Sequence, residues 1–164
     1  SEIQKNLLFL QSYKDSGLIT EEDIVEAIPK TLQDNIFDLT QLILTKKIDQ
    51  ARDLVKDLTL QGEDEIKLIA IMLGQFRLYT QVKILQESGQ TESQMVSSLG
   101  NYLGRNPNPY QIKFALRDSR RLSLDFLQNS IRYLIQADYQ IKTGVYEKGY
   151  LFERALLQIA SQSN

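Results

Sequence analysis

The sequence predicts an all-α fold of about eight or nine helices. Apolar residues recur at helical spacing in nearly every segment, and no segment shows the strict alternation of apolar and polar residues that is typical of a strand. Capping residues and glycines separate these segments, as expected at helix starts and helix ends. At 164 residues, the chain is long enough for one domain, or for one domain and part of another.

Four helices are predicted in the N-terminal part of the chain. Their apolar residues place them over residues 2–14, 21–28, 33–45 and 49–60. Thr20 and Asp23 form a capping-box pattern at the start of the second of these helices. Pro29 ends that helix, because proline cannot continue a helix that has begun.

The longest and most apolar helical pattern spans residues 63–88. The segment Ile66–Leu73 leaves almost no polar side, and a helix that is apolar on all sides is buried on all sides. A membrane-spanning helix needs about 18 uninterrupted apolar residues, whereas Lys67 and Arg77 interrupt this run. We therefore expect this segment to be a central core helix that the other helices cover.

Four further helices are predicted after the central helix. Thr91 and Gln94 cap a short helix, and the segment Gly100–Pro109, with two prolines and two glycines, is the main irregular loop. Another helix ends near residue 121, and Ser123 caps the one after it. The last two helices span residues 124–142 and 146–160. Glycine closes three of the predicted helices, at Gly62, Gly89 and Gly144.

The composition excludes several classes of site. The chain has no cysteine and no histidine, so it has no thiolate metal site, no cysteine nucleophile and no Ser-His catalytic pair. The segment Gly144–Gly149 has the glycine spacing of a phosphate-binding loop, but Tyr150 stands where that loop needs a lysine. The acidic clusters at residues 21–23 and 63–65 are interpreted as helix starts. We expect no catalytic residue, no cofactor and no metal.

An alternative interpretation of residues 91–116 is a helix-turn-helix that binds DNA. The residues that it would place in the major groove are Asn108, Tyr110, Gln111 and Lys113. Such a motif joins its helices by a turn of about three to four residues, and the predicted loop is longer. The net charge of −2 gives no overall attraction to nucleic acid or to an anionic membrane.

The most basic neighbourhood of the chain lies in and after this segment. Its arginines are Arg105, Arg117, Arg120 and Arg121. Asp118 and Asp125 are close enough in sequence to pair with some of them. We interpret the cluster as a surface that faces a protein partner, with at most weak, non-specific contact with DNA.

Several short segments together carry a resemblance that no single motif provides. They are Ile19–Val25, Ile28–Thr40, Ala51–Leu54, Gln75–Leu78, Pro109–Lys113, Ala115–Arg117 and Ala137–Gly144. In this order they resemble the delta subunit family of bacterial DNA polymerase III, over nearly the whole chain. The first two segments resemble the junction where the small lid of an AAA+ module passes into a helical collar domain. The segment Gly100–Asn108 is longer than the usual link of the family at that place.

The resemblance implies two parts of the chain. Residues 1–31 would be the C-terminal end of the AAA+ lid domain, and residues 32–164 the helical collar that packs against the collars of other clamp-loader subunits. The implied partners are the ATPase subunit gamma or tau and the delta-prime subunit. The family member is cytoplasmic, does not hydrolyse ATP, and binds the sliding clamp through an N-terminal domain. That domain would precede Ser1, so the chain is expected to be a piece of a longer protein.

Tyrosines outside or at the edge of the core stripe of the last two helices form a candidate partner interface. They are Tyr133, Tyr139, Tyr146 and Tyr150. Tyrosine and arginine are enriched at the centres of protein interfaces, so Arg120 and Arg121 are included as candidates. The alternative is that these tyrosines only cover the edge of the bundle.

Overall fold

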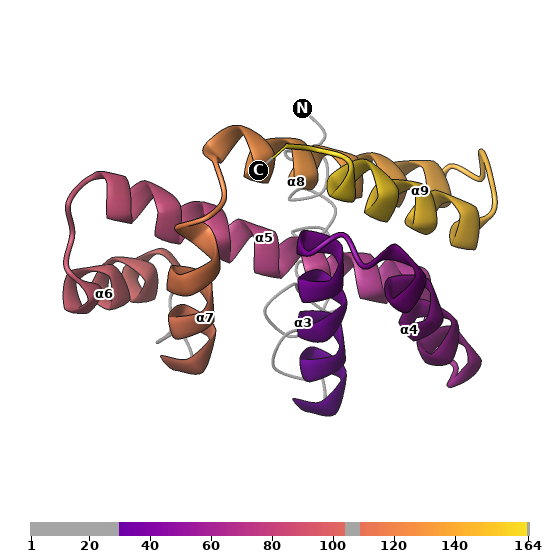
Figure 1. Ribbon diagram of the computed structural model, residues 1–164, viewed down its shortest axis with the longest axis horizontal. Coiled ribbons are helices and arrows are strands. Elements are labelled where there is room, and N and C mark those ends of the chain that lie inside the picture. The colour runs from indigo at the N-terminus through magenta and orange to yellow at the C-terminus, as the bar shows by residue number, and fades with distance from the viewer. Residues whose placement is uncertain (1–29, 104–108, 164) are drawn as a thin grey trace, which may run out of the picture.

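The computed structural model describes residues 30–103 and 109–163. In these two ranges the chain forms α-helices and no strand, which confirms the all-α prediction. The helices are α3 (Lys30–Leu44), α4 (Ile48–Leu60), α5 (Glu65–Glu87), α6 (Glu92–Leu103), α7 (Pro109–Ser119), α8 (Leu124–Lys142) and α9 (Lys148–Ala160) (Figure 1). The helices predicted over residues 2–14 and 21–28, with the capping box at Thr20 and Asp23, lie outside the described residues.

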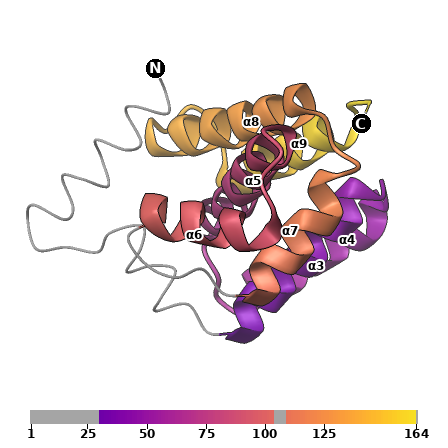
Figure 2. The same ribbon diagram turned by 90° about the vertical axis from the view of Figure 1, so that its left-hand side faces the viewer.

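The helix α5 runs through the middle of the bundle. Figure 1 shows α8 and α9 along one side of it and α3, α4 and α7 on the other. The helix α5 packs directly against α3, α6, α7, α8 and α9. The helices α8 and α9 lie side by side as an antiparallel hairpin. Figure 2, turned by 90°, shows the same two layers with α5 between them. The element that the sequence marks as most apolar is therefore the one that both layers cover.

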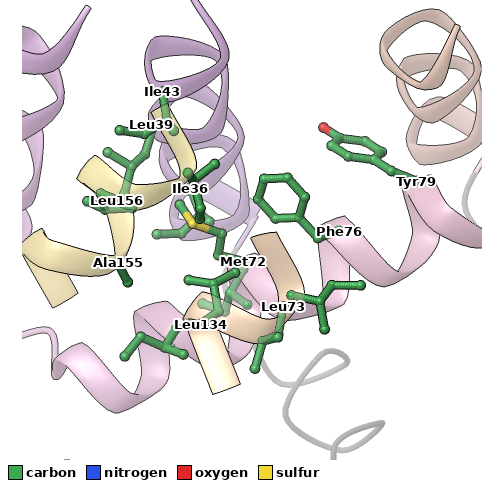
Figure 3. Close-up of a cluster of buried hydrophobic side chains, with 14 of the residues drawn as sticks. Ile36, Leu39, Ile43, Met72, Leu73, Phe76, Tyr79, Leu134, Ala155 and Leu156 are labelled. Atoms are coloured by element: carbon green, nitrogen blue, oxygen red, sulfur yellow. The ribbon is translucent and has the colours of Figure 1, made fainter. Parts of the chain in front are cut away.

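The buried side chains of α5 form the centre of the core. Those that are almost completely buried are Leu68, Ile69, Met72, Phe76, Tyr79 and Val82. Figure 3 shows Met72 of α5 in one cluster with Ile36 and Leu39 of α3, Leu134 of α8, and Ala155 and Leu156 of α9. Ile66 and Ala70 are only half-buried, so burial of the first half of α5 is nearly, but not completely, all-round.

By length and composition, α5 would be apolar enough to cross a membrane. Its place in the bundle accounts for this character, because its apolar side chains pack against five other helices. The prediction of a central core helix is confirmed.

Local capping signals are realised as the sequence predicts. Thr91 and Gln94 form a reciprocal capping box: the Gln94 backbone N–H donates to Thr91 Oγ1 at 3.2 Å, and the Thr91 backbone N–H donates to Gln94 Oε1 at 2.8 Å. Ser123 Oγ accepts from the backbone N–H of Phe126 at 3.0 Å and caps α8. At the start of α5, Asp64 accepts from the backbone N–H of Ile66 at 2.8 Å.

The three glycine stops also have the conformation that a helix end requires. Gly62, Gly89 and Gly144 all have positive φ. The helix α3 ends at Leu44, close to the predicted residue 45, but no glycine marks that end. Instead Lys46 has φ 62°, and the Lys47 backbone N–H donates to the Leu42 carbonyl at 2.8 Å. A lysine in this left-handed conformation is less favourable than a glycine. The α3–α4 turn therefore uses glycine-type geometry without a glycine in its sequence.

The prediction of an irregular loop over Gly100–Pro109 is wrong at both of its boundaries. The helix α6 continues through Gly100 to Leu103, and α7 begins at Pro109, while residues 104–108 lie outside the described residues. A glycine inside a helix costs only about 1 kcal/mol, and proline is favoured at the first helical position. Gly100 and Pro109 therefore lie within helices instead of ending them. The last helix also begins two residues later than predicted, at Lys148, which leaves Tyr146 in the preceding turn.

Candidate functional site

Three of the four candidate tyrosines lie together at the end of the α8–α9 hairpin. Tyr139 is in the last turn of α8, Tyr146 is in the connection between the helices, and Tyr150 is in the first turn of α9. These three and Val145 are between 46% and 59% exposed. We call these four residues the aromatic end surface. Among the described residues only two other large apolar side chains, Leu60 and Ile84, are similarly exposed.

Contacts across the hairpin hold the aromatic end surface in place. The rings of Tyr146 and Tyr150 meet edge to face, with their centroids 5.8 Å apart. The guanidinium of Arg154 lies 5.9 Å from the centroid of Tyr150 and donates to the side chain of Gln140 on α8. In the described part of the chain, Arg154 Nε is buried and has no hydrogen-bond partner.

Ion pairs attach this end of the hairpin to the starts of neighbouring helices. Lys148 Nζ lies 2.7 Å from Asp64 Oδ2, at the start of α5, and Arg52 of α4 pairs with Glu153 of α9. The hydrogen bond from Lys148 lowers the pKa of Asp64, and the same bond raises the pKa of Lys148. These two ion pairs therefore join the start of α9 to α4 and to the start of α5.

Tyr133 does not belong to this surface. It lies in the middle of α8, is half-buried and packs against the hydrophobic core. Tyr139 lies six positions further along the helix, so the two side chains leave the helix on different faces. The sequence places both tyrosines off the core stripe, but only one of them joins the exposed group.

Arg120 and Arg121 lie at the opposite end of α8, in the turn that follows α7. The 19 residues of α8 separate the two ends by roughly 28 Å, at 1.5 Å per residue. The six candidate residues therefore do not share one surface. Three tyrosines lie at one end of α8, the two arginines lie at the other end, and Tyr133 is half-buried between them.

The arginine region is organised by a residue whose role the sequence revealed only in part. Asp118 is 1% exposed, and its Oδ1 accepts from Arg117 Nε and Arg121 Nη2, each at 3.1 Å. Pairing of Asp118 with nearby arginines was expected and is confirmed. Its Oδ2 also accepts from Gln41 Nε2 of α3 at 2.7 Å and from the Tyr79 hydroxyl of α5 at 3.2 Å. One carboxylate therefore joins α3, α5, α7 and the turn after α7.

Burial raises the pKa of Tyr79 far above its ordinary value, and the negative charge of Asp118 raises it further. The phenol therefore stays protonated as a donor to Asp118. No sequence signal pointed to this pair, because Tyr79 and Asp118 are 39 residues apart.

One objection to the helix-turn-helix interpretation was the length of the predicted loop. This objection is weaker in the structure, because α6 ends at Leu103 and α7 begins at Pro109. However, α7 packs mainly along α5, not against α6. Of the residues that it would place in a groove, Lys113 is exposed, whereas Asn108 and the side chains of Tyr110 and Gln111 are outside the described residues.

Two other types of site to consider in the described ranges are a metal site and a catalytic pocket. No group of three or more acidic side chains there could hold a metal ion. An open groove between α5, α6 and α7 is lined by Gln86, Gln90, Glu92, Met95, Leu116 and Arg120. This lining contains no nucleophile with an adjacent base, the arrangement that covalent catalysis requires.

Comparisons with known proteins agree on one family. Residues 33–159 match the family described as DNA polymerase III delta subunit, C-terminal domain. The DNA polymerase III subunit delta of Bacillus subtilis (strain 168) is 32% identical over 162 residues, which cover 99% of this chain and 44% of that protein. The solved structure of the Bacillus subtilis DNA clamp loader delta protein superposes with a TM-score of 0.71 at 32% identity, covering 88% of this chain and 41% of that one.

The resemblance seen in the sequence is thus confirmed, and no match supports the DNA-binding alternative. The chain spans less than half the length of the relatives that it matches. It belongs to the DNA polymerase III delta subunit family and carries the C-terminal domain of that family.

Proposed function

We propose that this chain is a non-catalytic scaffold part of a clamp-loader delta subunit, and that it packs against the collar domains of other loader subunits. The assembled loader would then place the sliding clamp on primed DNA during replication. Membership of the delta family supports the assembly in which it acts. The observation that carries the role of scaffold is the aromatic end surface at the α8–α9 turn.

The composition of the aromatic end surface suits a protein partner. Tyrosine and arginine are enriched among the residues that contribute most to binding, because an aromatic body is buried while a polar tip keeps a hydrogen bond. Here the rings of Tyr146 and Tyr150 contact each other, and the guanidinium of Arg154 lies against Tyr150.

The proposed partners are the ATPase subunit gamma or tau and the delta-prime subunit. The sliding clamp would be contacted through a region of the delta subunit other than this chain. The chain itself would bind neither nucleotide nor metal, and would act in the cytoplasm. The absence of nucleotide and metal binding is supported by the sequence, which has no histidine, no cysteine and no phosphate-binding loop.

The test uses the full-length protein with Tyr146→Ala and Tyr150→Ala together. We expect weaker assembly with purified loader subunits in size-exclusion chromatography, and helical content equal to that of the unaltered protein. Ile84→Ala, which truncates an exposed apolar residue on α5, is the matched control and should assemble normally.

The competing interpretation is that these tyrosines only cover the edge of the bundle. It predicts a lower melting temperature for the double variant and unchanged assembly. That result would move the interface to another surface of the chain.

A further inference from the structure

A second surface combines aromatic and basic groups, on the face shared by α3 and α7. Phe37 of α3 and Phe114 of α7 are half-buried, and their ring centroids lie 4.6 Å apart. The guanidinium carbon of Arg117 lies 5.1 Å from the Phe114 centroid and 6.0 Å from that of Phe37. These distances are typical of cation–π contacts, so Arg117 is held against both rings.

Arg117 and Arg121 are also held next to each other by the same oxygen of Asp118. The side chains of the two arginines are 52% and 61% exposed, whereas the carboxylate is fully buried. Each guanidinium uses one nitrogen on Asp118, and a guanidinium has five N–H donors in all. Two positive charges share one negative charge, so these three side chains keep one net positive charge, and most of their N–H donors are not used by Asp118.

The carboxylate of Asp118 has little capacity left for other partners. It already accepts from four side chains, two on each oxygen. It therefore fixes the arginines without attracting a further cation. Holding long side chains in place beforehand lowers the entropy that binding would otherwise cost.

We propose that Arg117 and Arg121 form a prepared binding site for a carboxylate side chain of a neighbouring loader subunit. This inference rests on the proposed function, because it takes the partner to be part of the same assembly. Arginine binds carboxylates well, since its planar fork can donate two parallel hydrogen bonds. The Phe37–Phe114 pair gives an apolar residue of the partner a place to pack beside the ion pair.

The surroundings favour a protein carboxylate over a nucleic-acid backbone. Asp34 and Asp38 are exposed on α3, on either side of Phe37 in the sequence. A duplex carries one negative charge per roughly 1.7 Å of its length, so it would run over these acidic residues. A single carboxylate that docks on the two arginines need not approach them.

The test is assembly of the full-length protein carrying Arg117→Gln and Arg121→Gln with purified loader subunits. Glutamine removes the charge and keeps an N–H donor for Asp118. We expect affinity for the subunits to fall about tenfold or more, equivalent to about 1.4 kcal/mol. The dependence of affinity on salt concentration should also become weaker. Arg132→Gln removes an exposed arginine from α8 and is the matched control, with affinity unchanged.

A melting curve accompanies each variant. If the double variant is destabilised, Arg121→Gln alone is measured, because its side chain is the more exposed of the two. Affinity and salt dependence equal to those of the unaltered protein would overturn the inference. So would unchanged assembly accompanied by loss of binding to primed DNA, which would assign the arginines to nucleic acid.

The two proposals fail separately. Normal assembly of the Tyr146 and Tyr150 variant, with loss of assembly in the arginine variant, would reject the aromatic end surface and retain the carboxylate site. The reverse result would retain the aromatic end surface alone.

Discussion

Asp118 shows how much of the helix arrangement can depend on one side chain. It is buried at the end of α7 and accepts hydrogen bonds from Gln41 of α3 and Tyr79 of α5. Buried polar groups are costly unless they are paired, and here every acceptor has a donor. The network therefore favours one relative placement of α3, α5 and α7, which apolar packing alone specifies less strictly.

Tyr79 gives this network a measurable pH dependence. Its pKa is raised from an ordinary value of 10.0. The unfolded chain therefore loses the phenol proton near pH 10, while the folded chain keeps it. The unfolded state gains free energy from that ionisation, so stability is full below pH 10 and declines as the pH rises above it.

We expect Tyr79→Phe to remove this part of the decline. Above pH 10, the free energy of unfolding of the unaltered protein should fall more steeply than that of the variant, by up to about 1.4 kcal/mol per pH unit. Urea titrations between pH 8 and 11 measure the difference. Tyr146→Phe is the control, because that tyrosine is exposed and should leave the slope unchanged. Parallel curves for Tyr79→Phe and the unaltered protein would contradict the assignment.

At the scale of elements, α5 is the helix on which the others depend. It packs against α3, α6, α7, α8 and α9, which is more neighbours than any other described helix has. Its C-terminal half changes from buried to exposed positions, with Phe76 fully enclosed and Ile84 44% exposed. Two truncations on this one helix should therefore differ greatly in effect.

Phe76→Ala should lower the free energy of unfolding by about 3–5 kcal/mol, because it removes a fully buried ring and leaves a cavity. That is a large part of a typical total of about 5–15 kcal/mol. Ile84→Ala should change it by no more than about 0.5 kcal/mol. Urea unfolding followed by circular dichroism measures both. Similar losses for the two variants would mean that α5 is placed incorrectly in the bundle.

At the scale of the whole molecule, local features were predictable and distant contacts were not. The caps at Ser123 and Thr91 could be predicted because each bond joins residues three apart in sequence. The Gln41–Asp118 bond joins residues 77 apart, which no local pattern reveals. The same limit applies to the candidate site. Exposed tyrosines near Gly144 could be found from the helical pattern, whereas the depth at which Tyr133 packs depends on the neighbouring helices.

The two regions that remain as candidate surfaces lie at opposite ends of α8. In a head-to-tail assembly, each subunit contacts two neighbours through two different surfaces. A chain with an aromatic surface at one end and a carboxylate site at the other could contact two neighbours at once. This arrangement requires the described helices to form one rigid unit.

A fragment that begins at residue 29 should fold without the segment before it. The division between a lid part and a collar part stays a prediction, and α3 already begins at Lys30, so the fragment must start before that helix. Because α3 to α9 share one continuous core, we expect a single cooperative thermal transition and the helical circular dichroism spectrum of a bundle. A fragment that also lacks α9 is the control, since it loses the buried side chains of Leu151, Phe152, Leu156 and Ile159 and should not fold cooperatively. A broad, non-cooperative transition in the first fragment would show that residues before 29 complete the core.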